Sequence, residues 1–313
     1  MDYCQNKESL LAERVIEQNK KPDFEAFWEK QILALRAKPV TIQREKLNTP
    51  YEKTFLTYKV SYSTHDRTVV DALFSVPAGR EDEKLPCVAY FHGGGGYKRI
   101  YHDVMSTGVC CFAIDVRSQG GTTVDKAEYQ TGDTKGSLMS RDLINKDGFY
   151  MKNIYLDAVR AMDVIAMMPE VDTSRIVTFG QSQGGALSIV ASAFSGLSQK
   201  CYVSEPSYSC LHRRTELGTG VFSAANDFLR RYPEYTDAAF DTLTYFDINN
   251  IVSLLNVPTD FCLALADPVC LPEFVYSAYA LVNAPKRIHF CPFVPHYTPD
   301  DYTLFVHGEF ANL

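Results

Sequence analysis

Short, mostly apolar runs recur along the chain after residue 86, and they restrict the possible folds more than any other feature of the sequence. Runs of this length that lack polar and apolar alternation are typical of strands buried on both faces of a parallel sheet. The runs are residues 87–91, 110–115, 176–179, 201–205, 261–266 and 287–293. The sequence therefore predicts an α/β fold with a mostly parallel central sheet and helices on both of its faces.

Three other segments predict one edge of this sheet and one of its covering helices. Residues 54–63 and 68–76 alternate polar and apolar side chains around a polar stretch at 64–67, which is the pattern of an antiparallel hairpin. Residues 150–168 place apolar side chains on one face at helical spacing. They predict the crossover helix that joins two parallel strands.

The chain has 313 residues and shows neither a composition break nor a linker rich in proline, glycine and serine. We therefore expect a single domain over 1–313. Residues 1–50 predict an N-terminal helical extension, whose aromatic stripe at 24–35 packs on the rest of the fold. Residues 206–258 are too long for a simple connection and are rich in aromatic side chains, so they predict a helical insertion after the sixth strand that roofs a site.

Charge and hydropathy limit the possible partners. The formal net charge of −7 comes without a block of like charges, which argues against a nucleic acid or an anionic membrane surface as partner. The first residues lack the basic and then apolar order of a signal peptide, and no stretch approaches the roughly 18 apolar residues that span a bilayer. A cytoplasmic protein that acts on a small molecule is expected.

Cysteine usage and motif content argue against metal and cofactor chemistry. The chain has nine cysteines, an odd number, and most lie inside the apolar runs, where a free thiol behaves as a small hydrophobic side chain. The sequence contains no Cys-x-x-Cys pair, His-Glu-x-x-His motif or phosphate-binding loop. We expect reduced thiols, no metal and no cofactor.

One serine has the local sequence context that is typical of a catalytic nucleophile. Ser182 follows the buried run 176–179 and precedes a series of good helix formers that begins at Ala186. This is the strand, turn and helix arrangement of a nucleophile elbow, in which the serine hydroxyl is raised at the carboxyl edge of the sheet. Gly180 and Gly184 would relieve the crowding that side chains cause in such a turn. We predict that Ser182 is the nucleophile, not an incidental serine in a tight turn.

A serine nucleophile needs a base, and the base needs an acid that orients it. In this topology both follow the serine along the chain, each in a loop after a later strand. Asp267 comes directly after the run 261–266, and His296 comes shortly after the run 287–293. His307 is the rival base, but a helix that begins near Asp300 would carry it away from this edge. The sequence predicts Asp267 as the acid and His296 as the base.

A cradle for the reaction oxyanion is the remaining requirement, and two backbone N–H groups normally supply it. The residue after the nucleophile, Gln183, provides one candidate. The loop after the run 87–91 reads His92-Gly-Gly-Gly-Gly96, and such glycines let amides approach a substrate oxygen closely. Gly94 is the predicted second donor, with Gly93 as the alternative.

With these residues assembled, the sequence resembles the acetyl xylan esterase and cephalosporin C deacetylase family, carbohydrate esterase family 7, over nearly its whole length. The matching segments are Asp115 to Gly121, Arg160 to Asp163, Gly180 to Gly185, Tyr245 to Asn249 and Asp267 to Cys270. The resemblance implies an α/β-hydrolase fold and removal of acetyl groups from acetylated xylooligosaccharides and cephalosporin C-like esters. It also implies a homohexamer whose active sites face an inner cavity.

The resemblance assigns a structural role to Arg117 and Gln119, which would brace the loops beneath the nucleophile, with Arg117 as a buried and paired charge. Three residues depart from the family pattern. Tyr297 stands where a glutamate usually follows the base, which affects the expected hexamer geometry. Gly94 replaces a tyrosine, which would widen the acyl pocket, and Ser118 replaces a glycine.

These residues predict a serine carboxylesterase. Ser182 attacks the acetyl carbonyl, His296 takes its proton and later returns it to the leaving sugar oxygen, and Asp267 orients His296. The amides of Gly94 and Gln183 hold the oxyanion. Two alternatives stay open: an esterase or peptidase of the same fold for longer acyl, feruloyl or peptide substrates, and a binding protein that has lost catalysis.

Overall fold

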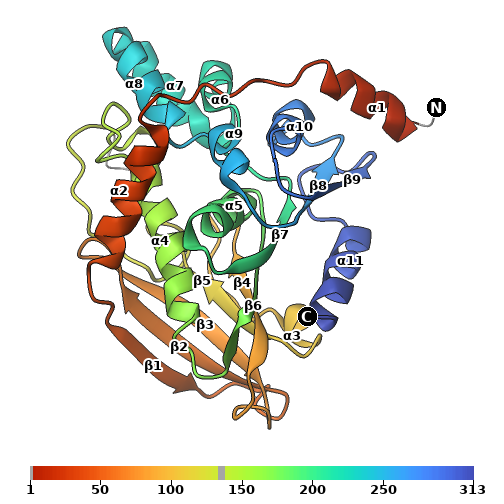
Figure 1. Ribbon diagram of the computed structural model, residues 1–313. Helices are drawn as coiled ribbons and strands as arrows, with labels where there is room; N and C mark the ends of the chain where they lie inside the picture. The colour runs from red at the N-terminus through yellow and green to blue at the C-terminus, as the bar shows by residue number, and fades with distance from the viewer. Residues whose placement is uncertain (1–2, 133–137) are drawn as a thin grey trace.

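The computed structural model describes residues 3–132 and 138–313, and within these ranges the strands form one nine-stranded mixed sheet (Figure 1). The strands lie in the order β1-β2-β3-β5-β4-β6-β7-β8-β9. They are β1 (Ile42–Leu47), β2 (Phe55–Ser63), β3 (Val69–Pro77), β4 (Leu85–Phe91), β5 (Cys110–Ile114), β6 (Val171–Gln181), β7 (Ser198–Ser204), β8 (Thr259–Ala264) and β9 (Lys286–Cys291).

The helices surround this sheet. They are α1 (Tyr3–Ala12), α2 (Phe24–Arg36), α3 (His102–Met105), α4 (Tyr150–Ile165), α5 (Gln183–Ser195), α6 (Leu211–Leu217), α7 (Ser223–Arg231), α8 (Thr236–Thr244), α9 (Ile248–Ile251), α10 (Pro272–Ala280) and α11 (Asp300–Ala311). Short 3-10 turns are η1 (Leu138–Ser140), η2 (Gly220–Phe222), η3 (Pro233–Tyr235) and η4 (Val252–Leu254). In the ranges given above, none of the helices has the length and apolar character needed to cross a bilayer.

The pairing of the strands confirms the predicted mixture of directions. β1, β2, β3 and β5 pair antiparallel in that order, and β5, β4, β6, β7, β8 and β9 pair parallel. At the carboxyl end of the parallel part, Phe91 pairs with Gly180 and Gly180 pairs with Val203. The loops that follow these strands therefore leave the sheet at the same edge.

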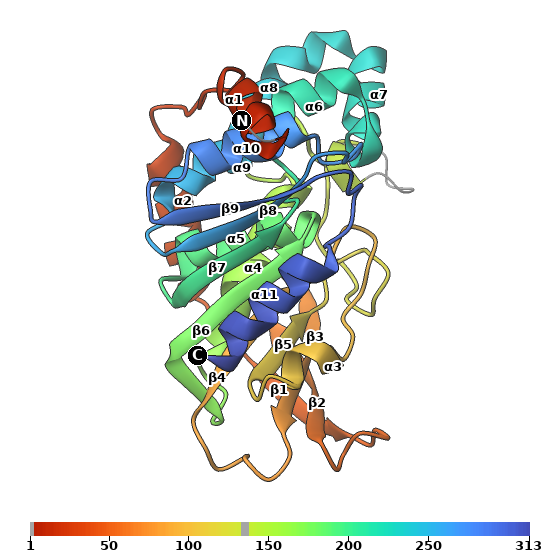
Figure 2. The ribbon, with the colours of Figure 1, turned by 90° about the vertical axis from the view of Figure 1, so that its right-hand side faces the viewer.

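Helices cover both faces of the sheet, as predicted. Residues Cys87, Ala89 and Phe91 of β4 face a core shared with α2, α4 and α5, whereas Val88 and Tyr90 face a second core shared with α3 and α11. Figure 2 shows α11 on the face opposite to α4 and α5. β4 is buried on both sides because it lies between these two cores, which explains its continuous apolar sequence.

The N-terminal segment differs in part from the predicted helical extension. Residues 42–47 form β1, which pairs with β2 at the edge of the sheet. Its sequence, Ile-Gln-Arg-Glu-Lys-Leu, contains mostly polar side chains that are partly or fully exposed. Charged edge strands of this kind resist pairing with other chains and carry no apolar pattern that would reveal them in a sequence.

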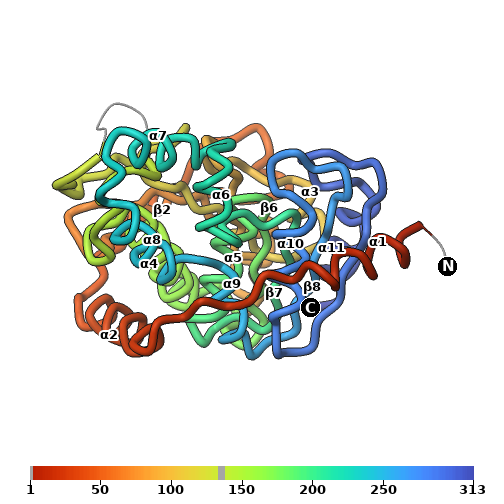
Figure 3. The backbone as a smooth tube through the Cα atoms, turned by 90° about the horizontal axis from the view of Figure 1, so that it is seen from above, coloured from red at the N-terminus to blue at the C-terminus, as the bar shows by residue number. Residues whose placement is uncertain are grey.

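The segment after β7 folds as helices α6 to α9, which agrees with the helical insertion expected over 206–258. Figures 1 and 2 place α6, α7 and α8 together at one end of the molecule. The chain between α1 and α2 crosses the same end (Figure 3). Gln18 Nε2 donates to the carbonyl of Asn249 at 2.6 Å, and the N–H of Asn19 donates to Asn250 Oδ1 at 3.1 Å, so the N-terminal segment is attached to α9.

Candidate active site

Ser182 lies in a strained turn between β6 and α5. Its backbone has φ 56° and ψ −121°, a combination that side chains other than glycine rarely adopt. Two hydrogen bonds of 2.9 Å hold it there: the Ser182 N–H donates to the carbonyl of Ser204, and the Ser207 N–H donates to the carbonyl of Ser182. The end of β7 therefore maintains the strained conformation of the turn.

The glycines of this turn are required by close backbone contacts. A Cβ on Gly180 would lie 2.4 Å from the carbonyl of Gly184, and a Cβ on Gly184 would lie 2.0 Å from the carbonyl oxygen of Phe91. Both distances are far below van der Waals contact. The absence of side chains lets α5 begin directly against the ends of β4 and β6, as the sequence predicts for an elbow.

Asp267 and His296 form a hydrogen-bonded pair. His296 Nδ1 lies 2.7 Å from Asp267 Oδ2. The other carboxylate oxygen, Asp267 Oδ1, accepts the N–H groups of Val269 at 2.7 Å and Cys270 at 2.9 Å. The carboxylate is buried, and these bonds fix its orientation. With Nδ1 directed to Asp267, the Nε2 atom of the imidazole is left for a proton transfer.

The serine turn and this pair are attached to the same element. Thr298, two residues after His296, donates its hydroxyl to Ser204 Oγ at 2.9 Å, while the carbonyl of Ser204 holds the N–H of Ser182. The buried Cys270 lies close to Asp267 and His296. Burial raises the pKa of its thiol, and hydrogen bonds from side chains that include Ser182 oppose this shift. The fold thus brings the Ser182 turn close to the loops that carry Asp267 and His296.

The rival residues lie elsewhere. His307 is on α11, with its Nε2 3.6 Å from a carboxylate oxygen of Asp103 on the other face of the sheet. Asp260 is at the start of β8 and forms an ion pair with Arg287 at 3.1 Å. His289 lies within β9 and is half-buried. Among the described residues, no hydrogen bond or ion pair joins the side chain of His307, Asp260 or His289 to the serine turn.

The two predicted oxyanion donors line one cavity of about 430 Å³. Gln183 is the first residue of α5, and its N–H therefore has no partner within the helix. In the glycine loop, a Cβ on Gly93 would lie 4.0 Å from Ser182 Cβ, whereas one on Gly94 would meet no atom within 4 Å. The structure thus places Gly93 against the serine and Gly94 at the open cavity, and both amides remain candidates.

Gln119 connects the two sides of this cavity. Its Nε2 donates to Gln183 Oε1 at 2.7 Å, and its Oε1 accepts the N–H of Gly95 at 2.9 Å. Gln183 Oε1 also accepts the hydroxyl of Tyr208 at 2.7 Å. Gln119 therefore fixes the glycine loop relative to the start of α5, and this is a bracing contact of the kind that the family resemblance implies.

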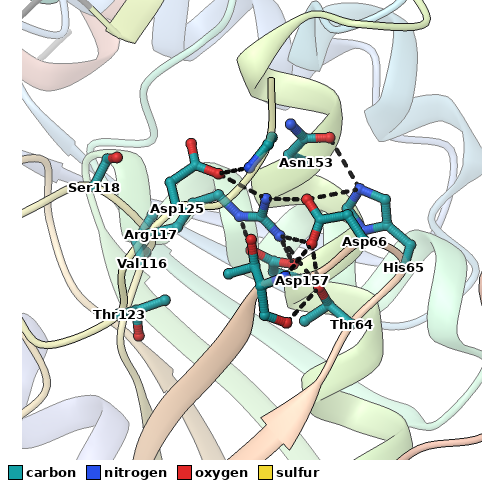
Figure 4. A network of polar contacts seen from close by, with 12 residues as sticks. Thr64, His65, Asp66, Val116, Arg117, Ser118, Thr123, Asp125, Asn153 and Asp157 are labelled. Atoms are coloured by element: carbon teal, nitrogen blue, oxygen red, sulfur yellow. Dashed lines mark hydrogen bonds and ion pairs between the residues drawn. The ribbon is translucent and has the colours of Figure 1, made fainter. Parts of the chain in front are cut away.

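Arg117 is fully buried and surrounded by carboxylates from three different segments (Figure 4). It contacts Asp157 through two hydrogen bonds of 2.6 Å, Asp66 at 2.6 Å and Asp125 at 3.1 Å. Burial alone would lower the pKa of Arg117, but the ion pairs with Asp157 and Asp66 raise it well above its ordinary value. Its carbonyl accepts the Tyr150 hydroxyl at 2.7 Å. Arg117 is thus a structural charge beneath the site.

Sequence reasoning missed Glu205, a fully buried carboxyl at the end of β7. Ser204 Oγ donates to Glu205 Oε2 at 2.7 Å, and Cys262 Sγ donates to Glu205 Oε1 at 3.2 Å. Burial raises the pKa of Glu205 from 4.5 to about 7. Its position directly after a buried strand is the same signal that identified Asp267, and it could have been recognised in that way.

Replacing Glu205 with glutamine should change the pH dependence of stability. The fold binds this proton more tightly than the unfolded chain does, so its contribution to wild-type stability is lost as pH rises from about 4.5 to 7. Relative to wild type, the Glu205→Gln variant is expected to be more stable at pH 8 than at pH 4.5, by a difference on the order of 2–3 kcal/mol.

Urea denaturation at both pH values measures this difference. Glu216→Gln, at an exposed site on α6, serves as the control and should shift the free energy of unfolding by less than about 0.5 kcal/mol at either pH. An identical effect of Glu205→Gln at both pH values would show that the buried carboxyl does not titrate in this range.

One cluster among the described residues has the ligand types of a metal site. Single ligand atoms of Asp267, Cys270 and His296 lie within 4.8 Å of one another. Carboxylate, thiolate and imidazole are ligands that zinc accepts. However, both oxygens of Asp267 already accept hydrogen bonds, from His296 and from the N–H groups of Val269 and Cys270. The same two groups, Asp267 and His296, are the acid and base that the sequence predicts.

Known proteins are similar to this chain over most of its length. A family model described as acetyl xylan esterase (AXE1) matches residues 9–308. The chain is similar to the acetyl esterase Axe7A of Xylanibacter ruminicola, with 25% identity over 287 residues. That match covers 89% of this chain and 64% of the relative, so the chain spans slightly less than two thirds of the relative's length.

Two solved structures share the whole fold. The acetyl xylan esterase from Paenibacillus sp. R4 has a TM-score of 0.91 and 28% identity, covering 100% of this chain and 99% of that one. Acetyl xylan esterase 1 from Thermoanaerobacterium sp. JW/SL YS485 has a TM-score of 0.88 and 22% identity, covering 100% and 98%. They confirm the predicted α/β-hydrolase fold. Because the family model covers nearly the whole chain, this protein belongs to the acetyl xylan esterase family.

Proposed function

We propose that the protein is a serine carboxylesterase that removes acetyl groups from small acetylated carbohydrates. The observation that carries this proposal is the 2.7 Å pair of His296 and Asp267 beside a serine in a strained strand-to-helix turn. Such a set of groups supports acyl transfer through a covalent serine intermediate. The protein's own side chains and amides supply every group that this chemistry needs.

The proposed reaction has two halves. Ser182 Oγ attacks the acetyl carbonyl while His296 Nε2 takes its proton, and the amides of Gly94 and Gln183 stabilise the oxyanion. His296 then gives the proton to the leaving sugar oxygen, which leaves an acetyl-serine. Water attacks this ester, with His296 again as base, and releases acetate and free Ser182. Asp267 holds the imidazole in one tautomer throughout.

The acetyl group and the carbohydrate are supported by the relatives. The matching proteins are named acetyl xylan esterase and acetyl esterase. The cavity of about 430 Å³ beside Gln183 has room for a small ester. Acetylated xylooligosaccharides and cephalosporin C-like esters both fit this substrate class.

A panel of acyl chain lengths tests the proposal. Purified protein is expected to hydrolyse p-nitrophenyl acetate with a kcat/KM at least about tenfold higher than p-nitrophenyl butyrate, because two additional methylene groups in the acyl chain cost at least this much in a site that is selective for acetyl groups. It should also release acetate from acetylated xylotriose. Higher rates with butyrate or feruloyl esters would instead identify an esterase for larger acyl groups. A lack of labelling by a fluorophosphonate probe would favour a binding protein.

A further inference from the structure

A second, larger cavity of about 790 Å³ lies between α7, η3 and the residues that flank η1. Its lining combines aromatic rings with charged and hydroxyl side chains. It includes Phe228, Tyr232, Tyr235, Asp227, Arg231 and Thr131. This lining differs from the mainly apolar interior of the sheet cores, and nothing in the proposed acetyl transfer uses it.

Three aromatic rings gather at this cavity. The ring of Phe228 lies 5.3 Å from that of Tyr232 and 6.2 Å from that of Tyr235, and the two tyrosine rings are 6.3 Å apart. Tyr232 is 46% exposed and Tyr235 is 39% exposed. A contiguous apolar patch that remains open to solvent is a feature of ligand-binding grooves. Tyrosine offers both a ring face and a hydroxyl to a ligand.

The charges around these rings indicate a neutral ligand. Asp227 and Glu234 are acidic, Arg231 is basic, and Arg230 pairs with Asp227 at 3.4 Å, so two positive charges balance two negative ones here. A charged ligand would meet no net opposite charge, and a purely apolar ligand would bury these polar groups without forming hydrogen bonds to them. A sugar chain matches both features, since its rings present apolar C–H faces and its hydroxyls form hydrogen bonds.

The cavity adjoins the smaller cavity that Gly94 and Gln183 line. Ser223 and Ala224, at the start of α7, line both this cavity and the smaller one that holds Gly94 and Gln183. A substrate whose ester lies in the smaller cavity can therefore extend directly into the larger one. The larger volume is well above what an acetyl group needs and is in the range of sites that hold molecules of several rings.

We propose that this larger cavity is the binding subsite for the non-reacting sugar units of an acetylated, uncharged oligosaccharide. Tyr232 and Tyr235 stack against sugar rings, and the charged side chains bind hydroxyls. The proposal rests on the function inferred above, because it places the carbohydrate part of the same substrate. It implies that chain length, and not only the acetyl group, determines how well a substrate binds.

Two substrates of different length test this subsite. The double variant Tyr232→Ala/Tyr235→Ala is expected to lower kcat/KM for acetylated xylotetraose by about tenfold, mainly through KM, because both stacking rings are lost. Its kcat/KM for p-nitrophenyl acetate should stay within about twofold of wild type. Tyr51→Ala removes a tyrosine of similar exposure, 44%, before β2, and should change neither value.

Binding measured without chemistry separates this inference from the proposed function. Wild type should bind deacetylated xylotetraose by isothermal titration calorimetry, and the double tyrosine variant should bind it at least about fivefold more weakly. The calorimetric result tests the subsite even if the protein shows no esterase activity. A lack of esterase activity would refute only the proposed function. Equal binding by both proteins, or equal losses of activity with both substrates, would overturn the subsite.

Discussion

Replacing Ser182 with alanine is expected to lower kcat/KM for p-nitrophenyl acetate by at least about 10³-fold. The variant retains the turn, the cavity and the pair of His296 and Asp267, but no group can form the acyl intermediate. Alanine fits the site, because only the hydroxyl is removed. Initial rates on purified protein measure the loss, and a fluorophosphonate probe should label wild type but not the variant.

Ser188→Ala is the matched control for this experiment. Ser188 lies on the same helix α5, is fully buried, and donates its hydroxyl to the carbonyl of Gly184 at 2.9 Å. Its loss should change kcat/KM by less than about threefold, since alanine is a good helix former and the backbone hydrogen bonds of α5 are retained. If Ser182→Ala kept more than about a tenth of the wild-type rate, Ser182 would not be the nucleophile.

Replacing Arg117 with methionine should have the largest effect on stability. Methionine fills most of the same space but leaves Asp66, Asp125 and Asp157 without their shared positive charge. Breaking a buried ion pair from one side typically lowers the free energy of unfolding by about 3–5 kcal/mol. Urea denaturation at pH 7 should therefore show a much lower midpoint, with little change in the slope m.

The control for Arg117 comes from the β2–β3 turn, which carries its partner Asp66. Arg67 pairs with Glu128 at 3.2 Å, but its side chain is 81% exposed. Arg67→Met should lower stability by less than about 1 kcal/mol, as is usual for surface pairs. The loss in Arg117→Met should also be smaller at pH 5 than at pH 8, because protonation removes the uncompensated negative charges. A loss below about 1 kcal/mol at pH 7 would contradict the structural role of Arg117.

The elements of the parallel sheet could be predicted from the sequence because their signals are local. Apolar runs such as 261–266 lie on β8, and the helical face of 150–168 lies on α4. The elbow at Ser182 could be predicted for the same reason, because the strand, the glycines and the helix that form it are consecutive in the sequence. β1 could not, because an exposed and charged edge strand has no apolar pattern.

The candidate site depended more strongly on long-range contacts. Position after a strand was sufficient to propose Asp267 and His296, and the same rule would have found Glu205. It did not reveal that Thr298 and Ser204 connect the base loop to the serine turn. The large cavity beside α7 could not be predicted from the sequence, which identified Phe228, Tyr232 and Tyr235 only as aromatic residues of an insertion. The hexamer expected from the family resemblance stays a prediction.

The sequence by itself determined the type and order of most strands and helices, the strained serine turn and the family, because periodicity, turn chemistry and motifs act over a few neighbouring residues. Only the tertiary structure decided which distant residues meet. The sheet order β5-β4-β6-β7-β8-β9 brings the loops of separate strands to one edge. The pairing of Arg117 with carboxylates from three segments, and the opening of the cavity beside α7, follow from helices and loops packing on that sheet.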